Sequence, residues 1–142
     1  MSEDNNNLIK IVNHLEFIGF TIVKRKVGPT GLTDITATRN IGESIMILET
    51  GATILFAYFA NTHIDKYFEK HIKDLYQLLN SINMDYDFIK ASLHEDNKYI
   101  LFTTPFTGNY DKKNFGQFIE LYLHSILDIV NTTHSEIRRF IQ

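Results

Sequence analysis

Two side chains near the end of the chain have a spacing that allows joint chemistry: His124 and Asp128 stand four positions apart. In a helix both would lie on one face, where an imidazole and a carboxylate can share a proton or ligate one metal ion. A hydrogen bond between two surface side chains explains the same spacing and needs no ligand. We interpret the pair as such a surface contact.

The other residues capable of chemistry are dispersed. No histidine stands in an H-E-x-x-H pattern, no serine stands in a G-x-S-x-G elbow, and the chain has no cysteine. The acidic pair Glu95-Asp96 falls in a predicted turn, where turn preference accounts for it. The sequence therefore predicts no catalytic residue, no metal site and no cofactor. The six histidines are His14, His63, His71, His94, His124 and His134.

The charge balance argues against nucleic acid as a partner. The net charge is −3 and the pI is about 6.0, so no long-range positive field exists to attract phosphates. The basic run Lys24-Arg25-Lys26 lacks interleaved aromatic residues and fits the solvated end of a strand.

Length and hydropathy predict one cytoplasmic domain. A chain of 142 residues with 44% apolar residues can bury a core as a single domain, 1–142, of which residues 1–6 are expected to be disordered. No apolar run approaches the roughly 20 residues of a membrane span, and the polar start does not resemble a signal peptide. The absence of cysteine suits a reducing compartment.

The most apolar stretch, Glu43 to Ala60, predicts a β-hairpin at the centre of an antiparallel sheet. The runs Ile45–Leu48 and Ala52–Ala60 flank Thr50-Gly51, which we expect to provide the positive φ of a tight turn.

Both faces of the second hairpin strand are apolar. Side chains alternate along a strand, which places Ile54, Phe56 and Tyr58 on one face. The opposite face receives Leu55, Ala57 and Phe59. Helices are expected to cover one face and something else the other. Helices on opposite sides could close both faces within the chain; otherwise either set could meet a homodimer partner or a segment of another protein.

Apolar stripes at helical spacing predict three main helices. They run from Asn7 to Ile18, from Thr62 to Asn83, and from Asp111 to Val130. The spacing of Thr62 and Asp65 predicts a capping box. A second box, Thr133 with Glu136, predicts a short helix over 134–142 after an interruption at 131–133.

Alternating patterns predict strands beside the hairpin. They cover Phe20–Val27, Thr33–Arg39, Tyr86–Leu93 and Tyr99–Thr104, and Pro105 is expected to end the last one. Residues 106–110 then form a predicted loop with exposed aromatic side chains.

The stretch Leu78 to Ile126 resembles the bacterial YbjN-like proteins, a family described as candidate sensory transduction regulators. The similarity lies in a leucine-rich helix ending in Asn80-x-x-Asn83, a hairpin with an acidic turn, an exit containing proline, and a long amphipathic helix. The resemblance implies the order α-β-β-β-α-β-β-α, similar to type III secretion chaperones, which form homodimers and hold extended effector segments. Our strand assignment contains one strand more.

We therefore predict an α+β fold: an antiparallel sheet of five to six strands with three main helices. The predicted function is a non-enzymatic protein-binding module, chaperone-like or regulatory, that acts as a homodimer. One alternative is a type III secretion-type chaperone for an effector. Another is a small-molecule sensor or enzyme with a pocket between the sheet and the last helix. The candidate partner-binding residues are Ile54, Phe56, Tyr58, Phe106 and Tyr110.

Overall fold

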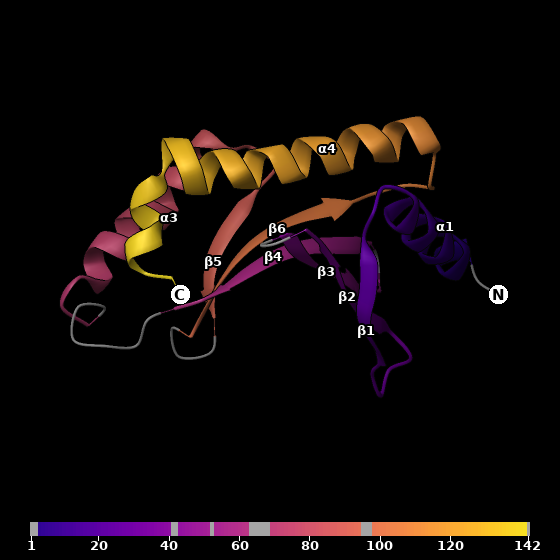
Figure 1. The fold of residues 1–142 in the computed structure, drawn as a ribbon. Coiled ribbons are helices and arrows are strands. Elements are labelled where there is room, and N and C mark those ends of the chain that lie inside the picture. The colour runs from indigo at the N-terminus through magenta and orange to yellow at the C-terminus, as the bar shows by residue number, and fades with distance from the viewer. Residues whose placement is uncertain (1–2, 41–42, 52, 63–68, 95–97, 142) are drawn as a thin grey trace. The chain divides into compact units, whose positions relative to one another are not determined.

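A computed structural model of the chain describes residues 3–40, 43–51, 53–62, 69–94 and 98–141, with side chains from Asn7 onward. Within them six strands hydrogen-bond in the order β1-β2-β3-β4-β6-β5 (Figure 1). This confirms the α+β class. Four strands precede α3, because residues 33–39 and 43–49 form separate strands. The elements are α1 (Glu3–Phe17), β1 (Thr21–Val27), β2 (Thr33–Arg39), β3 (Glu43–Glu49), β4 (Ile54–Asn61), α3 (Ile72–Asp85), β5 (Lys90–His94), β6 (Tyr99–Phe106), α4 (Lys112–Asp128), the π-helical turn η1 (Ile129–Thr133) and the 3₁₀ turn η2 (Ser135–Arg139).

Contacts divide the chain into two compact units. The first unit comprises Met1–Ala57 and Pro105–Glu120, and the second comprises Tyr58–Thr104 and Leu121–Gln142. Strands β4 and β6 and helix α4 each contribute residues to both units. The single domain stays a prediction, and each unit is described by itself.

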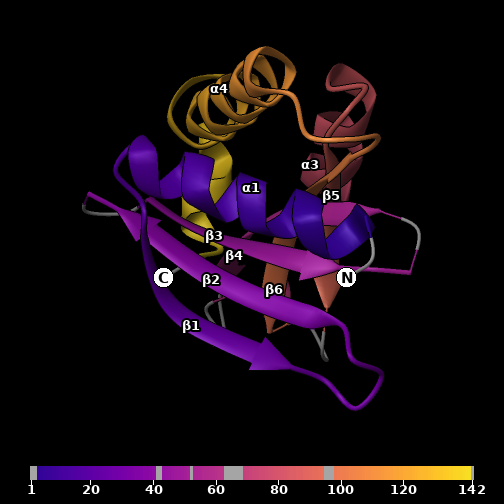
Figure 2. The same ribbon diagram turned by 90° about the vertical axis from the view of Figure 1, so that its right-hand side faces the viewer.

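In the first unit, α1 lies on one face of strands β1–β3 (Figure 2). The predicted stripe of α1 is buried except for Ile18, which follows the helix and is half-buried, and Gly19 ends the helix with a φ of +105°. The helix begins at Glu3 and not at Asn7, because an apolar stripe carries no information about a polar turn that precedes it. The buried residues of the stripe are Leu8, Ile11, Val12 and Leu15.

The hairpin between β3 and β4 closes differently from the prediction. Gly51 does not have a positive φ. Instead the backbone N–H and the hydroxyl of Thr50 both donate to the carbonyl of Thr53, at 2.9 and 2.8 Å. The threonine side chain therefore stabilises the turn that we had assigned to glycine.

In the second unit, the end of α3 is joined to β5 by Asn83. Its amide nitrogen donates to the carbonyl of Ala91 at 2.9 Å, and its amide oxygen accepts the Ala91 N–H at 2.6 Å. Strand β5 begins at Lys90, four residues later than predicted, because Tyr86 caps α3 with its N–H on Ile82. Thr62, the predicted start of the second helix, instead forms an antiparallel bridge with Ile141 and donates its N–H to the carbonyl of Lys98 at 2.9 Å, while its predicted capping partner Asp65 lies outside the described residues.

Strand β6 continues through Pro105 to Phe106, two residues past its predicted end. Pairing with β5 ends at Thr103, so the missing N–H of Pro105 removes no hydrogen bond to β5. Phe106 is consequently a strand residue and is 8% exposed, in contrast to the predicted exposed loop.

Candidate functional site

Three of the predicted partner-binding residues belong to the core of the first unit. Ile54, Phe56 and Phe106 are 6, 0 and 8% exposed. The rings of Phe56 and Phe106 both contact Phe115 and Phe118 on α4, with centroids 5.2 to 5.7 Å apart. Their assignment as surface contacts is therefore corrected: α4 covers this face of β4, and no area remains for a partner.

The other two residues are half-buried and lie in different units. Tyr58 packs on Phe102 in the second unit, with ring centroids 6.1 Å apart, and burial raises its pKa. Tyr110 in the first unit has its hydroxyl 2.8 Å from Nδ1 of His14. The sequence pattern alone did not distinguish the half-buried tyrosines, Tyr58 and Tyr110, from the three residues that are buried in the core.

On the opposite face of the sheet in the first unit, strands β3 and β4 carry apolar side chains. Directly paired residues lie on the same face of a sheet, so Leu48 stands beside Leu55, and Met46 beside Ala57. The side chains of Met46, Leu48 and Leu55 are half-buried. The helices of this unit lie on the other face, beside Ile47 and Phe56 (Figure 2). We call Met46, Leu48 and Leu55 the open-face cluster; Ala57, beside Met46, is 0% exposed and is not part of it.

A second candidate site lies in the second unit, where α3 and the C-terminal turns border an open cavity of about 690 Å³. Its lining includes Asp74, Asp85, His134 and Arg139, together with apolar Met84. Titratable groups of both signs therefore surround the space.

A π-helical turn positions the polar side chains beside this cavity. The N–H of His134 donates to the carbonyl of Ile129 at 3.0 Å, five residues back. The regular helix α4 therefore ends at Asp128, and the turn begins two residues before the predicted interruption at 131–133. Such turns occur frequently at functional sites. The predicted capping box of Thr133 and Glu136 is not formed, because the Thr133 hydroxyl turns back to the carbonyl of Asp128 at 3.3 Å.

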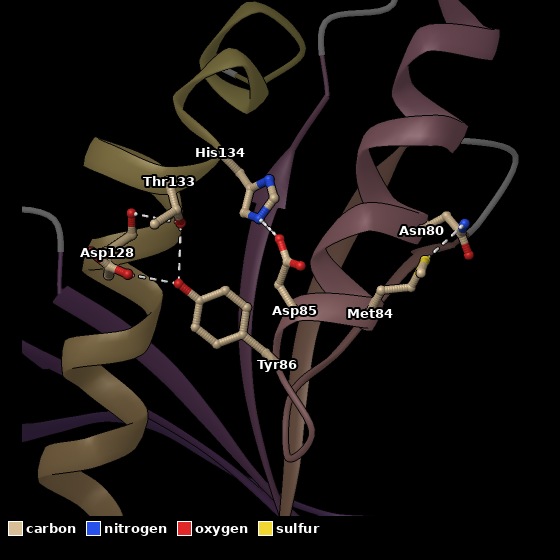
Figure 3. Close-up of polar contacts among 7 residues, drawn as sticks. All are labelled: Asn80, Met84, Asp85, Tyr86, Asp128, Thr133 and His134. Atoms are coloured by element: carbon tan, nitrogen blue, oxygen red, sulfur yellow. Dashed lines mark hydrogen bonds and ion pairs between the residues drawn. The ribbon is translucent and has the colours of Figure 1, made fainter.

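Two polar contacts join α3 to this turn (Figure 3). The hydroxyl of Tyr86 donates to Asp128 Oδ2 at 2.7 Å and lies 3.1 Å from the hydroxyl of Thr133. His134, which is 8% exposed, has Nε2 2.9 Å from Asp85 Oδ2. Burial, with smaller contributions from the two carboxylates, raises the pKa of Tyr86.

The hydrogen bond between Tyr86 and Asp128 takes the place of the predicted pairing of His124 with Asp128. Asp128 accepts a hydrogen bond from Tyr86, and His124 is exposed. Within the part of the chain that the structure describes, no group of three or more His, Asp or Glu side chains could hold a metal ion. Tyr86 was missed because it lies 42 residues from Asp128, a separation that no local pattern can bridge.

Comparison with solved structures identifies the fold. The chain matches the crystal structure of YbjN from E. coli, described as a candidate transcription regulator, with a TM-score of 0.70 over 95% of both chains. The fold is YbjN-like. At 15% identity the similarity establishes the fold alone. No protein-family model matches the sequence, and the search of curated proteins found no match either.

Membrane insertion through a helix finds no support in this YbjN-like fold. Among the described residues, no helix combines the length and the apolar character needed to cross a bilayer.

The Tyr86 contact in this YbjN-like fold gives a first testable prediction. Tyr86→Phe removes a partly exposed hydroxyl that meets Asp128 and Thr133, so we expect the free energy of unfolding to fall by about 1 kcal/mol or less. Tyr76→Phe, on the same helix and 51% exposed, is the matched control and should change nothing. Urea denaturation measures both. An equal loss in the two variants would contradict a specific role for the Tyr86 hydroxyl.

Proposed function

We propose that the chain is a non-enzymatic, regulatory protein-binding module that acts as a homodimer. The observation that carries the proposal is the open-face cluster in the first unit. Fully burying a Leu or Met side chain contributes roughly 1.5–3 kcal/mol relative to leaving it exposed. Because the side chains of the cluster are only half-buried, a partner that covers them would add a favourable contribution to the free energy of association.

Polar residues border the cluster on the β1 and β2 side. The row of Leu48 continues to Asp34 and Lys26, and the row of Met46 continues to Thr36 and Lys24. An apolar centre with a polar rim is the arrangement typical of protein interfaces. A second copy of the chain would present the same cluster and could cover it about a two-fold axis.

The test is a charge placed in the cluster. Leu55→Glu should convert a dimer into a monomer, because burying an unpaired carboxylate in an interface is strongly unfavourable. Light scattering measures the mass, and circular dichroism checks that the variant is folded. Thr38→Glu is the control, since Thr38 pairs with Ser44 on the same face but outside the cluster. A folded Leu55→Glu variant that remains dimeric would contradict the proposal.

The secretion-chaperone alternative uses the same cluster for a different occupant. An extended segment of another protein would then cover it in place of a second copy. Such a complex would contain unequal chains, and its mass would separate it from a homodimer.

A small-molecule sensor is the second candidate function. It is favoured by the cavity of about 690 Å³ in the second unit, a size typical of ligand pockets. The cavity lies between α3 and the C-terminal turns and not between the sheet and the last helix, where we had predicted it. A compound that binds there should raise the melting temperature of the protein.

A further inference from the structure

A smaller cavity of about 290 Å³ lies beside α1 in the first unit. Four of its residues follow one face of α1, at positions 10, 13, 14 and 17, and two more come from the segment before α4 and from the first residue of α4. The lining residues are Lys10, Asn13, His14, Phe17, Tyr110 and Lys112.

The charge of this cavity is positive. Lys10 and Lys112 contribute ammonium groups, and none of the six lining residues is acidic. Two carboxylates adjoin the lining residues in sequence, Glu16 beside Phe17 and Asp111 beside Lys112, and neither lines the cavity. Asp111 accepts the N–H of Asn114 at 3.0 Å and so caps the first turn of α4. Burial and the charge of Lys112 lower the pKa of His14, as expected beside a cation.

The cavity also offers an aromatic surface. Phe17 is 83% exposed, and Nζ of Lys112 lies 6.0 Å from the centre of its ring. An exposed ring beside an ammonium group can stack with a flat ligand while the charge meets an anion.

The floor of the cavity is ordered by contacts of His14. Its Nδ1 lies 2.8 Å from the Tyr110 hydroxyl, and its ring packs edge-on against Phe115, with centroids 5.0 Å apart. These contacts fix the imidazole and the phenol before a ligand arrives, which reduces the entropy lost on binding.

We propose that this cavity binds a small aromatic anion, with a phosphate monoester preferred over a carboxylate. The two lysines would meet the phosphate, whose second negative charge favours it over a carboxylate, and Phe17 would meet the ring. The site is separate from the open-face cluster, and the inference does not rest on the proposed function.

Calorimetry with phenyl phosphate as the probe tests the proposal. We expect phenyl phosphate to bind about tenfold more tightly than inorganic phosphate, phenol or benzoate, since only phenyl phosphate combines a dianion with a ring. NMR titration should show the pKa of His14 rising when the probe binds, because a nearby anion favours the imidazolium.

Matched variants locate the site. Lys112→Gln should weaken binding of phenyl phosphate about tenfold. Lys113→Gln removes the same charge one position along α4, outside the lining, and should leave binding unchanged. Circular dichroism checks that both variants fold.

Four results would overturn the proposal. Binding of phenyl phosphate no tighter than that of phenol would mean that charge is not recognised. Equal losses in the two lysine variants would indicate a general attraction of anions. No binding at millimolar phenyl phosphate would mean that the site does not exist, and benzoate binding as tightly as phenyl phosphate would remove the phosphate preference.

Discussion

Replacing Phe56 with alanine is expected to lower the free energy of unfolding by about 3–5 kcal/mol. Phe56 is 0% exposed, and its ring lies 5.7 and 5.2 Å from the rings of Phe115 and Phe118, measured between centroids. Truncation removes the buried ring and leaves a cavity between β4 and α4. Urea denaturation measures the loss as a lower transition midpoint.

Phe17→Ala is the control for this substitution. Phe17 is 83% exposed, so the same truncation should change the free energy of unfolding by about 0.5 kcal/mol or less. If Phe56→Ala kept full stability and lost only association, Phe56 would be the partner contact that the strand pattern had suggested, and its place in the core would be contradicted.

Tyr122→Phe is expected to lower the free energy of unfolding by about 1–2 kcal/mol at neutral pH. Tyr122 is 0% exposed, and its hydroxyl donates to the carbonyl of Phe102 at 2.7 Å. The substitution keeps the ring and removes the hydroxyl, so the loss reports the hydrogen bond and not the packing. Tyr99→Phe, in the same unit and half-buried, serves as control and should cost less.

The same residue predicts a dependence on alkaline pH. Burial raises the pKa of Tyr122 far above the ordinary value of 10.0. Above about pH 10 the unfolded chain loses this proton while the folded chain keeps it, so the unfolded state binds fewer protons and stability falls as the pH rises. The loss approaches about 1.4 kcal/mol per pH unit.

The Tyr122→Phe variant lacks this ionisable hydroxyl, so its free energy of unfolding does not fall for this reason. The free energy of unfolding of the wild type should therefore fall towards that of the variant between about pH 9 and pH 11. Burial also raises the pKa of Tyr58, which is present in both proteins and whose charge, once formed, raises the pKa of Tyr122 further. Denaturation curves at several pH values measure the gap, which is the difference in free energy of unfolding between the wild type and Tyr122→Phe. A gap that stays constant would mean that the phenol of Tyr122 ionises in the folded protein.

Local patterns predicted most of the elements because their causes are local. The stripe of α1 and the Asp111 cap of α4 depend on residues within a few positions, and both are confirmed. The bounds of β2 are those predicted. Where ends differ, the cause lies elsewhere: β6 passes Pro105 because the pairing with β5 has already stopped.

The site could be predicted only in part. Alternation along β4 correctly separated Phe56 from Leu55, but it could not say which of them meets α4, because that depends on Phe115, about 60 residues away. The contact of Tyr86 with Asp128 has the same origin. Residue type and spacing therefore define the two faces of a strand, and long-range packing decides which one is left open.

The most direct test of the proposed function is the mass of the wild-type protein in solution, measured by light scattering at low micromolar concentration across a salt series. We predict a dimer whose mass does not change with salt, because apolar association through the open-face cluster is not screened. A monomer at every salt concentration would contradict the homodimer.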